Sequence, residues 1–125
     1  MIHLKPVEYT VISKWFVDYQ KKSKNFEMPS EHAETIGIYR GEELIGYFII
    51  TNYENGINID QGYLKPEARH KNLSRIAMGL LEKAVKQAGK KMIVLSTNRA
   101  VSSYQSFMRN MGFSLVKATF VKELN

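Results

Sequence analysis

Residues 57–81, INIDQGYLKPEARHKNLSRIAMGLL, carry the strongest structural signals in the chain. Its first part, 57–64, follows a turn signal at Asn55 and Gly56 and is predicted as a strand, which Pro66 ends because proline cannot donate a hydrogen bond to a neighbouring strand. A helix is predicted to follow, with Asn72 at its N-cap and Gly89 just beyond its C-terminus. The apolar residues of this helix recur at helical spacing, as Leu73, Ile76, Ala77, Leu80, Leu81, Ala84, Val85 and Ala88. The stretch therefore predicts a strand, a loop and an amphipathic helix.

A second strand is predicted directly after this helix. Residues 92–96, MIVLS, form a short continuous apolar run, which is typical of a strand buried on both faces. Because a strand, a helix and a strand in succession form a right-handed crossover, we expect the strands at 57–64 and 92–96 to be parallel.

Two hairpin signals lie upstream. Residues 35–39 and 44–53 are strand-like, and the RGEE turn between them contains a glycine that accepts a positive φ. Asn55 and Gly56 form a strong turn signal immediately before the strand at 57–64. Three antiparallel strands in a meander are therefore predicted, which makes the sheet mixed.

The two ends of the chain add further elements. Ile2–Leu4 is predicted as an edge strand, and Pro6 is expected in the first turn of a helix that runs to about Lys22. Residues 23–32 are expected to form a loop or a short helix. Apolar residues at helical spacing support the first helix, namely Val7, Val11, Ile12, Trp15, Phe16 and Tyr19.

A second short helix is expected before Gly112, followed by a last strand at 113–124. Its apolar positions are Val101, Tyr104, Met108 and Met111. The predicted order is β-α-β-β-β-α-β-α-β, an α+β fold in which a mixed, mostly antiparallel twisted sheet is flanked by helices.

The composition limits the class of protein. The chain has 125 residues, of which 44% are hydrophobic, and this suits a single globular domain spanning residues 1–125. It has no cysteine, and His3, His32 and His70 share no ligand spacing, so we expect no disulfide and no metal site. With no signal peptide and no long apolar run, we expect a cytoplasmic protein without a membrane partner.

The charge points to an anionic partner. A net charge of +6 and a pI of about 9.5 favour nucleic acid, an acidic protein or a phosphate-bearing cofactor. The basic residues are spread along the chain and no nucleic-acid-binding motif is recognisable, so nucleic acid is not expected as a partner.

The loop before the long helix is the best candidate for an anion site. The N-terminus of a helix presents unpaired backbone N–H groups and the positive end of a dipole. Here it is preceded by Arg69, His70 and Lys71 and followed by Arg75, which add positive charge. The alternative is an ordinary basic start of a helix.

Residues 63–75, YLKPEARHKNLSR, resemble the acetyl-CoA pyrophosphate loop of the GNAT N-acetyltransferases. That loop has Arg or Gln, two residues, Gly, one residue, then Gly or Ala. Arg69 matches its first position, while Asn72 and Ser74 stand where the two small residues are usual. Because asparagine tolerates the left-handed backbone region better than most residues, Asn72 is expected to substitute for glycine.

Two further segments resemble the same family. Residues 39–50 are similar to its second hairpin, and residues 98–113, which end in Asn-Met-Gly-Phe, are similar to its C-terminal motif. Together the likeness covers roughly residues 2–121 in the order of elements of this fold. A small member of the kind that phages encode is one possibility that the likeness allows.

The resemblance implies acetyl-CoA as co-substrate. Backbone groups of Gly62, Tyr63 and Leu64 would pair with the pantetheine arm as an added strand does, and the amides from Asn72 to Arg75 would hold the pyrophosphate. The candidate cofactor-binding residues are Gly62, Tyr63, Leu64, Arg69, His70, Lys71, Asn72, Leu73, Ser74, Arg75 and Asn98. Asn98 is also interpretable as a turn or cap residue.

The candidate catalytic residues are Asp60 and Tyr104. Asp60 lies near the middle of its strand, where a carboxylate can take a proton from an incoming amine; otherwise it is a solvent-facing strand residue. In many relatives a tyrosine protonates the leaving thiolate from the position that Met108 holds here. Tyr104 lies one turn earlier on the same predicted helix face and is the expected substitute, or else a groove-lining aromatic residue. Ser103 could take the same place as Tyr104, and Glu34 and Glu43 are weaker candidates for the base.

Three functions follow from these observations. The first is an N-acyltransferase that moves an acetyl or similar group from acyl-CoA to a primary amine of a small molecule or a protein. The second is a catalytically degenerate protein of the same fold that binds a protein partner or has a structural role, motivated by the lost glycines and by Met108. The third is a nucleic-acid-binding module. The oligomeric state is left open, with a homodimer possible.

Overall fold

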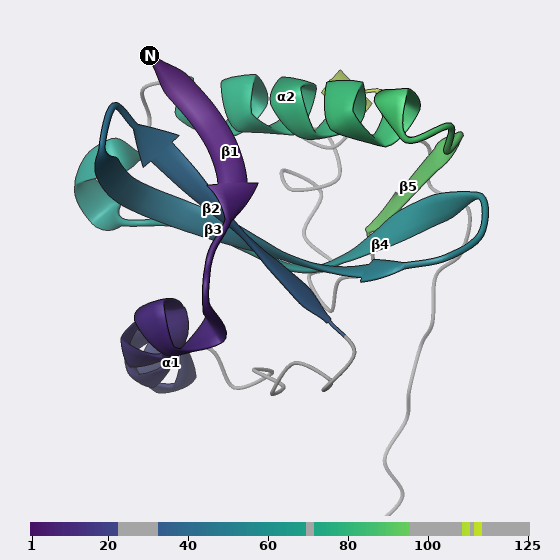
Figure 1. Cartoon of the computed structure of the whole chain (residues 1–125). Coiled ribbons are helices and arrows are strands. Elements are labelled where there is room, and N and C mark those ends of the chain that lie inside the picture. The colour runs from purple at the N-terminus through teal and green to yellow at the C-terminus, as the bar shows by residue number, and fades with distance from the viewer. Residues whose placement is uncertain (23–32, 70–71, 96–108, 111, 114–125) are drawn as a thin grey trace, which may run out of the picture.

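The computed structural model describes residues 1–22, 33–69, 72–95, 109–110 and 112–113. The elements in chain order are β1 (Ile2–Pro6), α1 (Tyr9–Lys22), β2 (Glu34–Arg40), β3 (Glu43–Asn52), β4 (Gly56–Leu64), the 3₁₀ helix η1 (Pro66–Ala68), α2 (Leu73–Gln87) and β5 (Met92–Leu95). The strands form a twisted five-stranded sheet in the order β1-β2-β3-β4-β5 (Figure 1).

The sheet is mixed, as the sequence predicts. β1, β2, β3 and β4 pair antiparallel with their neighbours, whereas β4 and β5 are parallel and are connected through α2. The predicted edge strand, the three-stranded meander and the parallel pair are therefore confirmed. Except for Phe113, the predicted last strand at 113–124 lies outside the described residues, as does all but the end of the second short helix.

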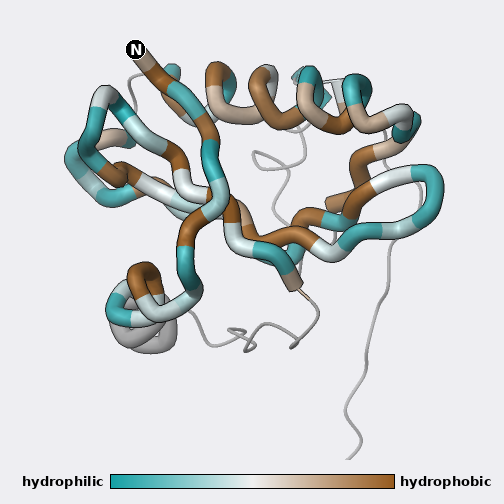
Figure 2. The backbone as a smooth tube through the Cα atoms, in the orientation of Figure 1, coloured by the Kyte–Doolittle hydropathy of each residue, from teal (hydrophilic) through white to brown (hydrophobic). Residues whose placement is uncertain are grey.

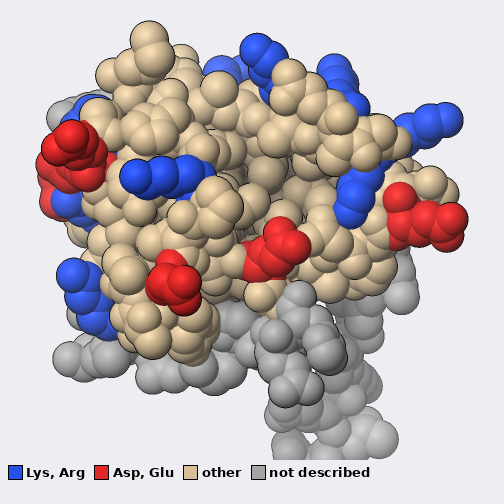
Figure 3. Space-filling view, viewed as in Figure 1, with Lys and Arg blue, Asp and Glu red and all other residues tan. Residues whose placement is uncertain are grey.

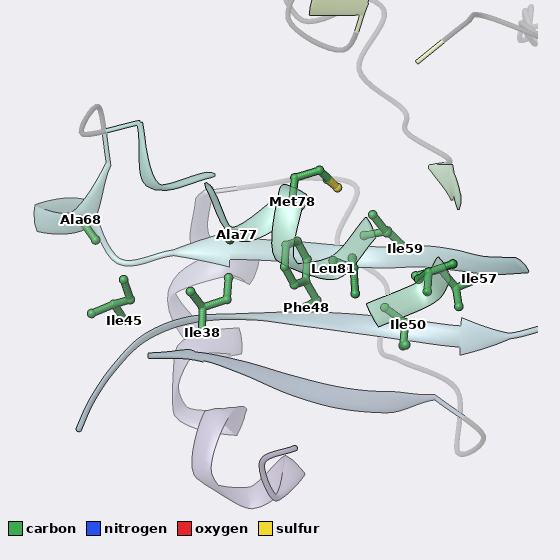
Figure 4. Packing of buried hydrophobic residues seen from close by; sticks show 11 residues of the cluster. Ile38, Ile45, Phe48, Ile50, Ile57, Ile59, Ala68, Ala77, Met78 and Leu81 are labelled. Atoms are coloured by element: carbon green, nitrogen blue, oxygen red, sulfur yellow. The ribbon is translucent and has the colours of Figure 1, made fainter. Parts of the chain in front are cut away.

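Helices α1 and α2 lie on opposite faces of the sheet (Figure 1). α2 covers one face and buries the larger of two hydrophobic clusters, to which Leu81 and Ala77 contribute from the helix (Figure 4). The buried residues of that cluster are Ile38, Ile45, Phe48, Ile50, Ile57, Ile59, Ala68, Ala77, Met78, Leu81 and Val85. On the other face, Ile12 of α1 packs with Tyr47 and Ile49 of β3. The centre of the sheet is hydrophobic and the turns at its ends are hydrophilic (Figure 2).

The C-terminal end of α2 has the predicted glycine. Gly89 has a φ of 80°, and its N–H donates to the Lys86 carbonyl at 3.0 Å. The N–H of Lys90 donates to the Val85 carbonyl at 3.1 Å. This pair of bonds is a Schellman motif, which satisfies carbonyl groups that the end of a helix leaves without partners.

Two details of the sequence prediction are wrong. Pro6 is the last residue of β1, opposite Ile36, and the helix begins only at Tyr9. Proline is tolerated there because β1 lies at the edge of the sheet. The strand at 92–96 is also not buried on both faces: Met92 and Val94 are exposed, while the intervening Ile93 packs against the core under α2.

No helix in the described ranges has the length and apolarity that crossing a bilayer requires.

Candidate active site

The strands β4 and β5 part at the position of Asp60. Their pairing begins at Gly56 and ends at Ile59, which lies opposite Leu95. From Asp60 to Leu64, β4 continues without a parallel partner among the residues that the structure describes. Among the described residues, one edge of β4 is therefore unpaired over Gly62, Tyr63 and Leu64, which by the family resemblance would pair with a pantetheine arm.

A β-bulge occurs at the same position. On β3, Ile49 pairs with Gln61 and Ile50 pairs with Ile59, so that Asp60 is the extra residue of β4. A bulge leaves its extra residue out of the ladder and bends the strand locally, and bulges are common next to active sites. The sequence gives no signal for it, because the register depends on the pairing with β3.

The Asp60 carboxylate is held by two neutral donors. The Thr51 hydroxyl donates to Oδ2 at 2.7 Å, and the Asn58 side-chain amide donates to Oδ1 at 2.6 Å. A carboxylate has about four lone-pair sites, so these two bonds orient it and leave acceptor capacity for a proton. Sequence reasoning missed Thr51 and Asn58. The available signal was that Asn58 and Asp60 are polar at alternate positions of an otherwise apolar strand.

The weaker base candidates lie elsewhere. Glu43 begins β3 and pairs with Arg40 at 3.3 Å and with Lys65 at 3.4 Å. Glu34 begins β2, and β3 separates that strand from β4. The structure therefore does not bring these two carboxylates to the opening at Asp60.

A short 3₁₀ turn links β4 to α2. Ala68 is completely buried, and the N–H of Lys65 donates to the Ile45 carbonyl at 2.9 Å, so both the start and the end of the turn are fixed. A hydrogen bond from its own backbone N–H, with a smaller contribution from the charge of Lys65, lowers the pKa of Glu67. Fixing this turn fixes where the chain enters the loop before α2.

Asn72 has the left-handed backbone that its place in the loop predicts. Its φ is 61° and its ψ is 15°, and no other non-glycine residue in the described segments has a positive φ. Its carbonyl accepts the first bond of α2, from Ile76 at 3.3 Å, which confirms it as N-cap, but its side chain makes no capping bond. Side-chain caps need an extended backbone, so the left-handed conformation explains the difference. The first N–H groups of α2 thus lack partners within the helix.

Exposed cationic side chains flank this helix N-terminus. Arg69 precedes it, with Nε 2.8 Å from the Leu64 carbonyl oxygen, and Arg75 lies in its first turn beside the exposed Ser74. On the face of the molecule in Figure 3, Lys and Arg side chains are interspersed with Asp and Glu side chains. The arrangement can hold an anion by backbone N–H groups, by the helix dipole and by guanidinium charge.

Five predicted positions are not placed. His70, Lys71, Asn98, Ser103 and Tyr104 lie outside the described residues, so their roles stay predictions. Among the described side chains, no group of His, Asp and Glu is arranged to hold a metal ion.

Comparison with known proteins identifies the family. A family model for the acetyltransferase (GNAT) domain matches residues 3–123. The chain belongs to the GNAT acetyltransferase family. GNAT acetyltransferases use acetyl-CoA as the acyl donor. The unpaired edge of β4 and the loop before α2 therefore belong to a fold whose members bind this substrate. No curated protein matches the sequence.

Solved structures show that the chain has the GNAT fold. YycN of Bacillus subtilis is 13% identical with a TM-score of 0.78, and the match covers 100% of this chain and 99% of that chain. The ribosomal-protein-S18-alanine N-acetyltransferase of Escherichia coli is 11% identical with a TM-score of 0.74, covering 94% and 80%. AAC(6')-Iy, solved with the bisubstrate analog CoA-S-monomethyl-acetylneamine, is 10% identical with a TM-score of 0.64, covering 100% and 99%. At such identities the likeness concerns the fold of this GNAT domain and not its acceptor.

The left-handed conformation of Asn72 gives a direct stability test. Replacing Asn72 with valine is expected to lower the free energy of unfolding by about 1–2 kcal/mol, because a β-branched residue is strained at a positive φ. Asn72→Gly is expected to stay within about 0.5 kcal/mol of the native chain, since glycine has no Cβ to clash. Urea unfolding followed by circular dichroism measures both.

Ser74→Val is the matched control, because Ser74 is exposed and lies two residues later within α2. Serine and valine have similar helix propensities, so it should change stability by only a few tenths of a kcal/mol, roughly. Equal losses for valine at both positions would contradict the left-handed assignment.

Proposed function

We propose that the protein is an acyl-CoA-dependent N-acyltransferase that transfers an acetyl or similar group to a primary amine, and that residues 1–125 form one acyl-CoA-binding domain. One observation supports this above the others: β4 carries Asp60 at its bulge, then the open edge of residues 60–64, and leads directly into the loop with left-handed Asn72. A candidate base, an unpaired strand edge that suits an extended arm and a candidate anion site would thus follow one another along one segment of the chain.

Substrate binding would use mainly the backbone. Pairing of the pantetheine amides with Gly62, Tyr63 and Leu64 would extend the sheet at the open edge of β4. The pyrophosphate would receive N–H groups from the start of α2, with Arg69 and Arg75 nearby. Holding the thioester beside Asp60 converts the reaction with a bound amine into an intramolecular one, which accounts for much of the rate.

In the chemical step, Asp60 would accept the proton of the attacking amine, directly or through a water molecule. The amine nitrogen forms a bond to the thioester carbonyl carbon, and the carbon–sulfur bond then breaks. Backbone N–H groups at the bulge would stabilise the negative charge on the carbonyl oxygen. The leaving thiolate takes a proton, for which Tyr104 remains the candidate donor. The products are the N-acylated amine and free CoA.

A primary amine is proposed as acceptor class because two fold neighbours are named for such chemistry. One is an N-acetyltransferase of a ribosomal-protein alanine, and the other was solved with an acetylneamine bisubstrate analog. These substrates are those of the two neighbours. A screen of primary amines identifies the acceptor of this chain.

The deciding experiment is titration of acetyl-CoA into the purified protein by calorimetry. We expect a micromolar Kd, and Arg69→Ala should weaken it by about tenfold through loss of a charged hydrogen bond to phosphate. Ser74→Glu should weaken binding by more than about tenfold, since it places a carboxylate where the pyrophosphate would lie. Because a glutamate in the first turn of a helix is favourable for the helix itself, this loss would not come from unfolding.

Lys83→Ala is the matched control. Lys83 is an exposed cation on α2 that lies more than two turns from the helix N-terminus, so its removal should leave the Kd within about twofold. The absence of binding at millimolar acetyl-CoA would contradict the transferase proposal and would turn attention to a degenerate protein of this fold.

A further inference from the structure

The Arg69 guanidinium is held by two contacts with β4. Its Nε donates to the Leu64 carbonyl oxygen at 2.8 Å, and its Cζ lies 5.3 Å from the centre of the Tyr63 ring. The second distance is within the range of a cation–π interaction. The side chain is nevertheless exposed, so these contacts fix a cation at the surface.

The Tyr63 ring is itself held in an aromatic cluster, which we define as Trp15, Tyr47 and Tyr63. Tyr47 is completely buried, and its ring stacks on that of Tyr63 with centres 5.5 Å apart. Trp15, from α1, lies 5.4 Å from Tyr63 and 5.8 Å from Tyr47. Three mutually packed rings cannot rotate independently, so the Tyr63 face that meets Arg69 is fixed by the core on the α1 side of the sheet.

These contacts order the Arg69 side chain and leave most of its N–H donors for a ligand. A guanidinium has five N–H donors in a rigid planar fork, and donation from Nε to Leu64 leaves the four on its terminal nitrogens for a ligand. A long flexible side chain normally loses much rotamer freedom when it binds a phosphate, and ordering it beforehand removes that cost. Arg69 is also the first residue after η1, at the start of the loop that leads to α2.

We propose that Tyr63 is a positioning residue, whose ring holds the Arg69 guanidinium in place to bind the pyrophosphate of acyl-CoA. This inference rests on the proposed function, in which Tyr63 otherwise takes part only through its backbone. The aromatic cluster would then contribute to substrate affinity. Through Trp15, Tyr63 and Arg69, helix α1 would support the candidate anion site.

The test is a double-mutant cycle on the Kd of acetyl-CoA, measured by calorimetry on the full chain. Tyr63→Leu should weaken binding about three- to fivefold, and Tyr63→Phe, which keeps the ring, should stay within about twofold. In the Arg69→Ala background, Tyr63→Leu should have no further effect, because the guanidinium that it positions is absent. Equal effects of Tyr63→Leu in both backgrounds would overturn the proposal, as would a Tyr63→Phe variant as weak as Tyr63→Leu.

Arg69→Lys gives an independent test that does not disturb the core. Lysine keeps the charge but has neither the Nε donor nor the planar face, so we expect binding about three- to fivefold weaker, a smaller loss than for Arg69→Ala. Affinity equal to that of the native chain would overturn the proposal, because charge alone would then be sufficient. Failure of the native chain to bind acetyl-CoA at all would instead overturn the proposed function together with this inference, which distinguishes the two failures.

Discussion

Replacing Asp60 with asparagine is expected to lower kcat by about 10²–10⁴-fold, the usual contribution of a general base. The change removes the charge while nearly preserving the shape. The new amide oxygen can accept from Asn58, and the new amide nitrogen can donate to the Thr51 hydroxyl oxygen, so both neighbours keep a partner. The KM for acetyl-CoA should stay within about twofold, because the loss concerns proton transfer and not cofactor binding.

The measurement is release of the CoA thiol, with the amine that reacts fastest in an acceptor screen. Glu54→Gln is the control: it also converts a carboxylate to an amide, but in the exposed turn before β4. It should change kcat by less than about twofold, as expected for a surface charge far from the reaction. An Asp60→Asn variant with native kcat would show that the amine loses its proton before it binds, or loses it to another group.

The largest expected effect on stability comes from Leu81→Ala. Leu81 is 1% exposed and lies in the cluster between α2 and the sheet. Deleting a fully buried leucine side chain leaves a cavity, and the expected loss is about 3–5 kcal/mol of unfolding free energy. Since whole domains are stable by only about 5–15 kcal/mol, the variant should be close to the limit of folding. Urea unfolding measures the loss.

Ile76→Ala is the matched control on the same helix. Ile76 is 43% exposed, so the substitution removes little buried surface and gains helix propensity. A loss of about 1 kcal/mol or less is expected. Similar losses at the two positions would mean that α2 does not present the Leu81 face to the sheet.

Much of the fold could be predicted because its local signals agree. The apolar residues from Leu73 to Ala88 all fall on one face of a helix. Turn residues such as Asn55 and Gly56 lie between two runs of strand-forming residues. These features depend on neighbours within a few residues, which a single sequence displays. The antiparallel meander and the parallel pair that these signals predict are both present in the sheet.

The features that the sequence did not predict correctly depend on pairing between strands that are distant in the sequence. Proline suits both the first turn of a helix and an edge strand, and only the pairing of β1 with β2 decides for Pro6. The bulge at Asp60 likewise arises from the register between β3 and β4, which no local pattern specifies.

In the candidate site, too, features set by residue type were predictable, whereas features set by tertiary packing were not. The left-handed backbone of Asn72 was predictable from the residue type, because few residues other than glycine tolerate it. The bond from Arg69 to the Leu64 carbonyl was not, since the conformation of a long side chain depends on packing around Tyr63.

The position of Pro6 and Lys5 at the end of β1 also bears on how the molecule behaves at high concentration. β1 is the edge of the sheet, and an exposed edge can act as a template for strand addition by another molecule. Pro6 has no N–H to offer such a strand, and the ammonium group of Lys5, 4.5 Å from the Tyr39 ring centre, places a charge beside it. At this edge, therefore, strand addition by a second molecule is disfavoured, whatever the concentration of the protein.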